Sequence, residues 1–145
     1  MLKGIPKILS PELLKALCEM GHGDKLVIAD GNFPCESVGK NAVVVRCDGA
    51  GTEVLLRAIL TVFPLDTYVQ KPVELMQVVA GDPVETPIWD SYKNIVSEFD
   101  SRGEEAFSQV ERFEFYERAK EAYLIIATSE SAIYANIILH KGVVI

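Results

Sequence analysis

Apolar residues recur along this chain at helical spacing in three long segments. Residues 10–20 form the first, in which Ser10 followed by proline is a typical helix start and Gly21 a typical stop. Residues 52–63 and 89–99 show the same spacing, and a proline ends the former. The pattern therefore predicts three amphipathic helices.

Shorter apolar runs between these helices predict strands. Residues 25–29 and 41–46 are nearly apolar throughout, as is typical of strands covered on both faces. The other predicted extended segments are residues 65–69, 73–79, 111–115, 123–128 and 136–140. Residues 116–122 read as a fourth helix and residues 100–105 as an exposed polar connection. The alternation favours the α/β class, as a single three-layer α/β/α domain over residues 1–145 with a mixed, largely parallel sheet.

Charge and hydropathy narrow the classes of partner. The formal net charge is −7 and no basic stripe is present, which argues against nucleic acid. Basic residues are scattered rather than clustered, so no membrane surface is expected, and no apolar run approaches the roughly 18 residues of a membrane span. The N-terminus lacks an apolar core of signal-peptide length. A neutral small molecule or another protein is the expected partner.

Cysteine spacing and the standard nucleotide motifs exclude several kinds of chemistry. Cys18, Cys35 and Cys47 are odd in number and lack CxxC spacing, so we expect free, packing thiols in a reducing cytoplasm and no zinc site. Glycine-rich phosphate loops and the GxSxG elbow do not occur, and residues 49–51 read as a turn into a helix. Proteins that bind nucleotide phosphates through a glycine-rich loop, and hydrolases with a serine nucleophile, are therefore disfavoured as functions of this chain.

His22, one of two histidines, lies between two glycines where a helix is predicted to end and a strand to begin. Imidazole exchanges protons near neutrality, so the position suits proton transfer, although a lone histidine near a helix C-terminus is more often a capping cation than a catalyst. Asp30 follows the strand of residues 25–29 and either meets a ligand at the strand's carboxyl end or begins a turn. His140, at another predicted strand end, is expected at the surface.

Further polar residues lie near predicted strand ends. Arg112 and Tyr116 suit sugar hydroxyls or a developing oxyanion, or they form a solvated helix start. Tyr134 and Asn136 can both donate and accept hydrogen bonds, which suits a hydroxyl-rich ligand, although a turn also explains Asn136. Asp66 is either a turn residue or another hydroxyl acceptor.

These residues belong to motifs through which the chain resembles the family of small sugar mutarotases that contains fucose mutarotase and ribose pyranase. The motifs are Met20-Gly-His-Gly-Asp24, Ala29-Asp30 followed by Phe33-Pro34, Leu65-Asp66-x-Tyr68, Arg112-Phe-x-Phe-Tyr-Glu-Arg-Ala119 and Tyr134-Ala-Asn136-Ile-Ile-Leu-x-Lys-Gly142. They run in one order over essentially the whole chain. Arg112 and Tyr116 favour the fucose branch, because the ribose branch typically has His and Lys there. Gly31-Asn32 departs from the Ala-His often found in fucose-type members. This departure affects only a secondary contact of the site and the choice of preferred sugar.

The resemblance implies that His22 is the proton donor and that the remaining site residues bind the sugar. The implied catalytic residues are His22, Asp30 and Tyr116, and the implied substrate-binding residues are Asp30, Asp66, Arg112, Tyr116, Tyr134, Ala135 and Asn136. The family further implies a ring-shaped homo-oligomer, commonly a decamer, with active sites between neighbouring subunits. A cytoplasmic protein without cofactor or metal is expected.

The implied reaction opens the cyclic hemiacetal of a free monosaccharide such as L-fucose and recloses it on the other face of C1. One group takes the proton of the anomeric hydroxyl while another protonates the ring oxygen, and each transfer contributes on the order of 10²–10⁴-fold. We assign His22 the acid/base role, with Asp30 either orienting it or binding a hydroxyl and Tyr116 or Tyr134 as a second proton path. The alternatives are a D-ribose pyranase, which interconverts pyranose and furanose, and a non-catalytic sugar-binding oligomer on the same scaffold.

Overall fold

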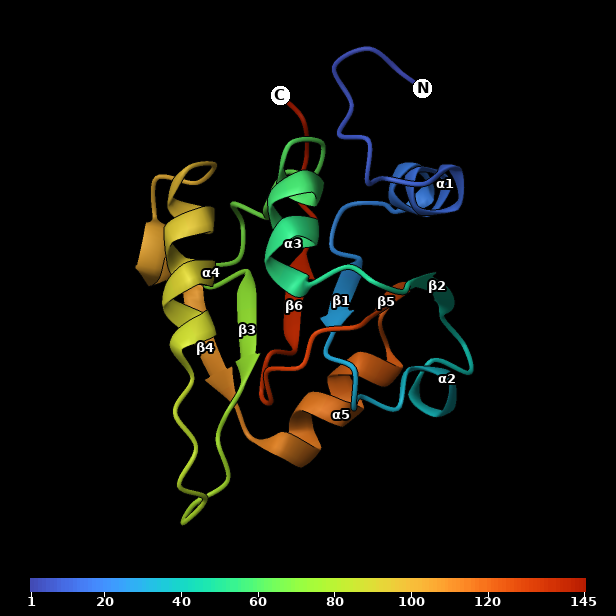
Figure 1. The fold of residues 1–145 in the computed structure, drawn as a ribbon. Coiled ribbons are helices and arrows are strands. Elements are labelled where there is room, and N and C mark those ends of the chain that lie inside the picture. The colour runs from blue at the N-terminus through green and yellow to red at the C-terminus, as the bar shows by residue number, and fades with distance from the viewer.

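One six-stranded sheet organises the molecule (Figure 1). The computed structural model describes residues 1–145. Its elements are α1 (Pro11–Glu19), β1 (Lys25–Ala29), α2 (Cys35–Val38), β2 (Val43–Cys47), α3 (Thr52–Leu60), β3 (Val73–Met76), α4 (Pro87–Ser97), the 3₁₀ helix η1 (Gly103–Ala106), β4 (Phe107–Val110), α5 (Arg112–Lys120), β5 (Leu124–Thr128) and β6 (Ile137–His140). The strand order is β2-β5-β1-β6-β3-β4, and only β6 runs antiparallel to its neighbours. The predicted mixed, largely parallel sheet is confirmed.

Helices cover both faces of the sheet, which gives the predicted three layers. On one face α1, α3 and α4 pack with Leu26 and Ile28 of β1 in the larger hydrophobic core. On the other face α2 and α5 pack with Val27 and Ala29 of the same strand. Successive residues of a strand point to opposite faces, so a fully apolar run such as β1 serves both cores.

The two ends of α1 are fixed by polar contacts. Ser10 Oγ accepts a hydrogen bond from the backbone N–H of Leu13 at 3.2 Å, so the predicted N-cap is confirmed. At the other end the Lys141 ammonium group donates to the carbonyls of Leu17 and Met20, at 3.2 and 2.6 Å. A cation thus satisfies the last carbonyls of the helix, and it comes from the far end of the chain.

The strand predicted over residues 111–115 is wrong, because α5 begins at Arg112 and the strand before it is β4. Glu111 is the N-cap, and its Oε2 accepts hydrogen bonds from the backbone N–H groups of the first helical turn at 2.9 and 3.1 Å. The alternation of Phe113 and Phe115 imitates a strand. On the helix Phe115 is buried and Phe113 lies exposed.

The other differences are smaller. The strand predicted at residues 41–46 is the edge strand β2, and Val43 is exposed, so the expectation of cover on both faces is wrong for it. Two short helices, α2 and η1, were not predicted, and η1 begins inside the expected polar connection. The predicted helix at 52–63 and strand at 73–79 end earlier than expected, at Leu60 and Met76.

The topology separates two ends of the sheet. In Figure 1 the arrow of β1 points from the end that carries both chain termini toward the end where α5 begins. Because β6 is antiparallel, the residues before β1 and after β6 share the first end, and those after β1 and before β6 share the second. At about 3.3 Å per residue, β1 and its flanking residues hold the two ends roughly 20 Å apart. No helix is both long and apolar enough to cross a membrane.

Candidate active site

Most of the predicted sugar-binding residues meet at the second end of the sheet. They line a hollow of about 280 Å³, here called the Asp30 hollow. Its lining residues are Asp30, Asn32, Phe33, Met76, Asp82, Arg112, Tyr116, Ile133, Tyr134 and Asn136. Five of these residues, from three separate segments of the chain, were predicted from the sequence. The fold therefore brings the predicted Asp30, Arg112, Tyr116, Tyr134 and Asn136 into one site.

Asp30 and Asn136 form a buried polar pair at the floor of this hollow. The amide nitrogen of the Asn136 side chain donates to Asp30 Oδ2 at 2.9 Å, and its Oδ1 accepts from the Asp30 backbone N–H at 2.8 Å. The backbone N–H of Asn32 donates to the other carboxylate oxygen at 3.0 Å. Burial raises the pKa of Asp30 above its ordinary value, although these hydrogen bonds oppose the shift. The pair is thus a preorganised acceptor and donor for hydroxyl groups.

The backbone around Tyr134 is held in an unusual conformation by aromatic side chains of α4. Tyr134 has φ = 57°, which a non-glycine residue adopts only where the surroundings fix it. The indole N–H of Trp89 donates to the Tyr134 carbonyl at 2.8 Å, and the Tyr92 hydroxyl donates to the Ala135 carbonyl at 2.7 Å. These bonds place Tyr134 and Asn136 in the hollow. The side chain of Ala135 is fully buried in the core and does not line it.

The hydroxyl of Tyr134 is engaged by a carboxylate. It donates to Asp82 Oδ2 at 2.8 Å, and this hydrogen bond is the main reason why the pKa of Tyr134 is raised. Asp82 lies in the long loop between β3 and α4 (Figure 1). The Tyr134 proton is therefore held by Asp82, which argues against the expected role of Tyr134 as a second proton path.

Aromatic contacts fix the wall that carries Arg112 and Tyr116. The Phe33 ring lies 5.5 Å from that of Tyr116 and 6.2 Å from that of Phe115, so α5 is packed onto the turn after β1. The Arg112 guanidinium lies 5.7 Å from the centre of the Tyr116 ring. Arg112 itself is exposed, so its donors remain available to a ligand.

The predicted proton donor lies at the first end of the sheet, with Asp66 and Tyr68; these three residues are called the His22 cluster. His22 Nε2 is 3.2 Å from Asp66 Oδ1, and the rings of His22 and Tyr68 are 5.3 Å apart. The backbone N–H of Tyr68 donates to the same Asp66 oxygen at 2.9 Å, so Asp66 is a turn residue as well as a histidine partner. His22 does not cap α1, because Lys141 occupies that position.

The charge environment of the His22 cluster suits proton transfer. The Asp66 side chain is only 4% exposed, whereas the His22 side chain is 44% exposed. A neutral imidazole that donates from Nε2 to the carboxylate presents Nδ1 as a proton acceptor. A carboxylate in the position of Asp66 can orient the ring and stabilise an imidazolium, as it does for a catalytic histidine.

Asp30 does not contact His22 within one chain. The two residues lie at opposite ends of β1, and the carboxylate that faces His22 is that of Asp66. Of the two roles considered for Asp30, only hydroxyl binding is compatible with this intrachain geometry. One chain therefore holds two separate groups of candidate site residues, called the two half-sites, which lie too far apart to contact the same monosaccharide.

The prediction that His140 lies at the surface is wrong. Its side chain is 13% exposed, and its Nε2 lies 3.4 Å from Oε1 of the buried Glu74, which also contacts Arg118 of α5. His140 ends β6 on the face that α5 covers, so a neighbouring carboxylate accounts for its burial.

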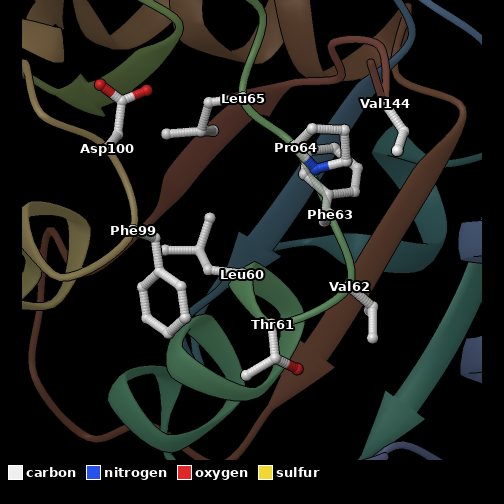
Figure 2. Close-up of a pocket in the computed structure, with 9 residues that line it drawn as sticks. All are labelled: Leu60, Thr61, Val62, Phe63, Pro64, Leu65, Phe99, Asp100 and Val144. Atoms are coloured by element: carbon white, nitrogen blue, oxygen red, sulfur yellow. The ribbon is translucent and has the colours of Figure 1, made fainter.

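A second hollow of about 280 Å³ lies beside the end of α3 and is largely apolar (Figure 2). It is lined by Leu60, Thr61, Val62, Phe63, Pro64, Leu65, Phe99, Asp100 and Val144. Asp100, its one charged group, is already bound to Arg102. This hollow lacks the converging donors and acceptors that a sugar requires. No group of three or more His, Cys, Asp or Glu side chains is arranged to hold a metal ion.

Sequence reasoning did not assign a role to several residues that border the two half-sites. Phe33 and Tyr68 occur in the sequence motifs without an implied role, and Met76 falls within the strand predicted over residues 73–79. Met76 is buried at the end of β3 and forms a wall of the Asp30 hollow. Tyr68 is 77% exposed beside His22, and an aromatic residue held in such a position is the signal that could have identified it.

A family profile, a curated relative and two solved structures all relate this chain to one family. The sequence profile of the RbsD / FucU transport protein family matches residues 3–144. Fucose mutarotase of Mus musculus is 50% identical over 145 residues, which cover 97% of this chain and 94% of the relative. The crystal structure of FucU from Bifidobacterium longum has a TM-score of 0.97 at 67% identity and covers 99% of this chain and 100% of that one. The structure of the fucose mutarotase from Streptococcus pneumoniae in complex with L-fucose has a TM-score of 0.91 at 46% identity, with the same coverage.

Proposed function

The chain belongs to the RbsD / FucU transport protein family, and we propose that it is an L-fucose mutarotase, an isomerase that interconverts the α and β anomers of the free sugar. One observation carries the proposal. A hollow that contains the buried Asp30–Asn136 pair, together with a histidine–carboxylate pair, is built from the motif residues of a chain half identical to a fucose mutarotase.

His22 is the proposed acid and base of the reaction. With Nε2 directed at Asp66, its Nδ1 takes the proton of the anomeric hydroxyl as the hemiacetal opens and returns a proton as it closes. Tyr116 is the proposed second proton path, because the Tyr134 proton is held by Asp82. Asp30, Asn136 and Arg112 bind the remaining hydroxyls from the Asp30 hollow.

The active site is proposed to form between two chains, with the His22 cluster of one facing the Asp30 hollow of the next. The separation of the half-sites along β1 supports this assignment, since no single chain presents both to one sugar. Exposed apolar residues border the half-sites, Tyr68 on one and Phe113 and Ile133 on the other, and would be covered by such contact.

An interface that joins two different surfaces is heterologous and closes into a ring when the rotation permits. A ring-shaped homo-oligomer is therefore proposed, and the decamer implied by the family resemblance is its proposed size, which native mass spectrometry can test. The protein is also proposed to be cytoplasmic and to form one domain. The free thiols of Cys18, Cys35 and Cys47 fit a reducing compartment.

NMR saturation transfer between the anomers of L-fucose tests the reaction. Wild type is expected to accelerate exchange far above the buffer rate, and His22→Ala to lose about 10²-fold or more of that acceleration. His140→Gln, a change at the only other histidine, serves as the matched control and should retain activity once folding is verified. A wild-type protein that leaves the exchange rates of both L-fucose and D-ribose at their buffer values would contradict the proposal.

The same experiment separates the two alternatives. A ribose pyranase accelerates exchange between the pyranose and furanose forms of D-ribose more than anomer exchange of L-fucose. A non-catalytic binding oligomer would bind sugar equally well before and after His22→Ala, with no catalysed exchange to lose.

A further inference from the structure

The loop that carries Asp66 and Tyr68 has no regular structure, yet a largely buried ion pair holds it. Arg102 and Asp100 are 24% and 14% exposed. Arg102 donates from Nε to Asp100 Oδ1 at 2.9 Å and from Nη2 to Oδ2 at 2.7 Å. This bidentate pairing fixes the plane of the guanidinium, because both groups are planar and fork-shaped.

The remaining donors of Arg102 point to the loop. Nη2 donates to the carbonyl of Asp66 at 3.1 Å and Nη1 to the carbonyl of Val69 at 2.8 Å. These carbonyls lie on either side of Tyr68 in the sequence. One rigid side chain, 36 residues away from Asp66, therefore spans the loop that faces His22.

Asp66 is consequently held at both of its backbone groups. Its N–H donates to the carbonyl of His140 at 3.0 Å, and its carbonyl accepts from Arg102. Figure 2 shows Asp100 and Leu65, the residue before Asp66, on the same side of the apolar hollow. The loop thus rests between β6 and the Arg102–Asp100 pair, and its Asp66 carboxylate and Tyr68 ring contact His22.

We propose that Arg102 is a positioning residue for catalysis, which holds the Asp66 loop so that the carboxylate meets His22 Nε2. The inference rests on the proposed mutarotase function. It assigns a catalytic consequence to a side chain that contacts neither the sugar nor His22. The sugar is bound mainly by the Asp30 hollow, so loss of Arg102 should reduce kcat while KM changes little.

The test compares Arg102→Met with Arg57→Met, the matched control. Arg57 of α3 forms an exposed ion pair with Glu98 at the end of α4, and neither residue belongs to a half-site. In L-fucose exchange measured by NMR, Arg102→Met should lower kcat by about 10- to 100-fold, because a displacement near 1 Å can cost about 10²-fold. KM should stay within about threefold, and Arg57→Met should match wild type. Arg102→Lys keeps the charge without the fork and should recover part of the rate.

A readout independent of activity accompanies the kinetics. The chain has two histidines, so the ring resonances of His22 and His140 can be assigned. Arg102→Met should move those of His22 more than those of His140, because the Asp66 carboxylate contacts the His22 ring and the Asp66 N–H contacts only the His140 backbone. If wild type catalyses exchange while Arg102→Met keeps the wild-type kcat and His22 resonances, the inference is overturned. If wild type is inactive, the proposed function fails, and the His22 resonances still decide whether Arg102 positions the cluster. If Arg102→Met does not fold, Arg102→Lys decides, and a wild-type kcat in that variant refutes the need for the fork.

Discussion

Removal of the Arg118 guanidinium should show how strongly the free energy of unfolding depends on the ion pair of the buried Glu74 carboxylate. Glu74 lies on β3 with a side chain that is 6% exposed, and Arg118 reaches it from α5. The second partner, His140, lies 3.4 Å away. Arg118→Met keeps most of the aliphatic stem but leaves a nearly dry carboxylate with only a histidine to oppose its charge.

The expected loss follows from the burial of the two groups. Breaking a buried ion pair costs about 3–5 kcal/mol, whereas an exposed pair contributes about 1 kcal/mol or less. Because the Arg118 side chain is 36% exposed, water screens it partly, and we expect a loss of roughly 2–3 kcal/mol. For a chain of this length that corresponds to a decrease in Tm of about 4–12 °C.

The loss should depend on pH in a defined direction. Burial alone would raise the pKa of Glu74, but the neighbouring His140 and Arg118 together hold it below its ordinary value of 4.5. The stabilisation by Glu74 is therefore complete above that ordinary value and disappears as the pH falls through the lowered one. The Tm difference between wild type and Arg118→Met should shrink below pH 4.5, where the unpaired carboxyl of the variant takes up a proton.

Thermal unfolding at one fixed protein concentration measures this effect, because assembly also contributes to Tm. Lys120→Met, which breaks the exposed pair with Glu117 on the same helix, is the control and should cost less than about 1 kcal/mol. The double variant Glu74→Gln with Arg118→Met should recover part of the loss, since no buried charge remains. Equal Tm changes for Arg118→Met and Lys120→Met would refute the reasoning.

Three further variants test other parts of the account. Asp30→Asn should raise KM for L-fucose by about tenfold or more, because a charged acceptor of sugar hydroxyls is lost; an unchanged KM would remove Asp30 from the binding site. Trp89→Phe breaks the 2.8 Å bond to the Tyr134 carbonyl and should cost about 0.5–1.5 kcal/mol in thermal unfolding, together with a severalfold rise in KM. Ser10→Ala removes the cap of α1 and should cost about 1 kcal/mol while kcat and KM stay at wild-type values.

Elements with strong local signals could be predicted from the sequence. The helix start at Ser10 and the strand Lys25–Ala29 are examples, because a cap and an uninterrupted apolar run each leave a mark that does not depend on distant residues. The start of α5 could not be predicted in this way. Its cap is Glu111, an unusual capping residue, and Phe113 and Phe115 alternate as in a strand.

The sequence predicts which residues belong to the candidate site but not how they are arranged in space. Motif residues such as Asp30 and Asn136 do meet, but only the antiparallel β6 brings residues 106 positions apart within hydrogen-bond distance. Strand β1 separates His22 from Asp30 and places His22 at the opposite end of the sheet, beside Asp66. The burial of His140 depends on Glu74 in a strand that is not its neighbour in sequence, so no local pattern could show it.

Subunit complementation tests the central claim, that each active site joins the His22 cluster of one chain to the Asp30 hollow of another. His22→Ala and Asp30→Ala are prepared separately, and the catalysed exchange of L-fucose anomers should be severely reduced in each. Mixed, dissociated and reassembled in equal amounts, they should regain activity, because about one quarter of heterologous interfaces then combine two intact half-sites. Activity near a quarter of the wild-type value is the predicted result. Reassembled mixtures that remain as inactive as the separate variants, alongside an active wild type treated in the same way, would contradict the claim.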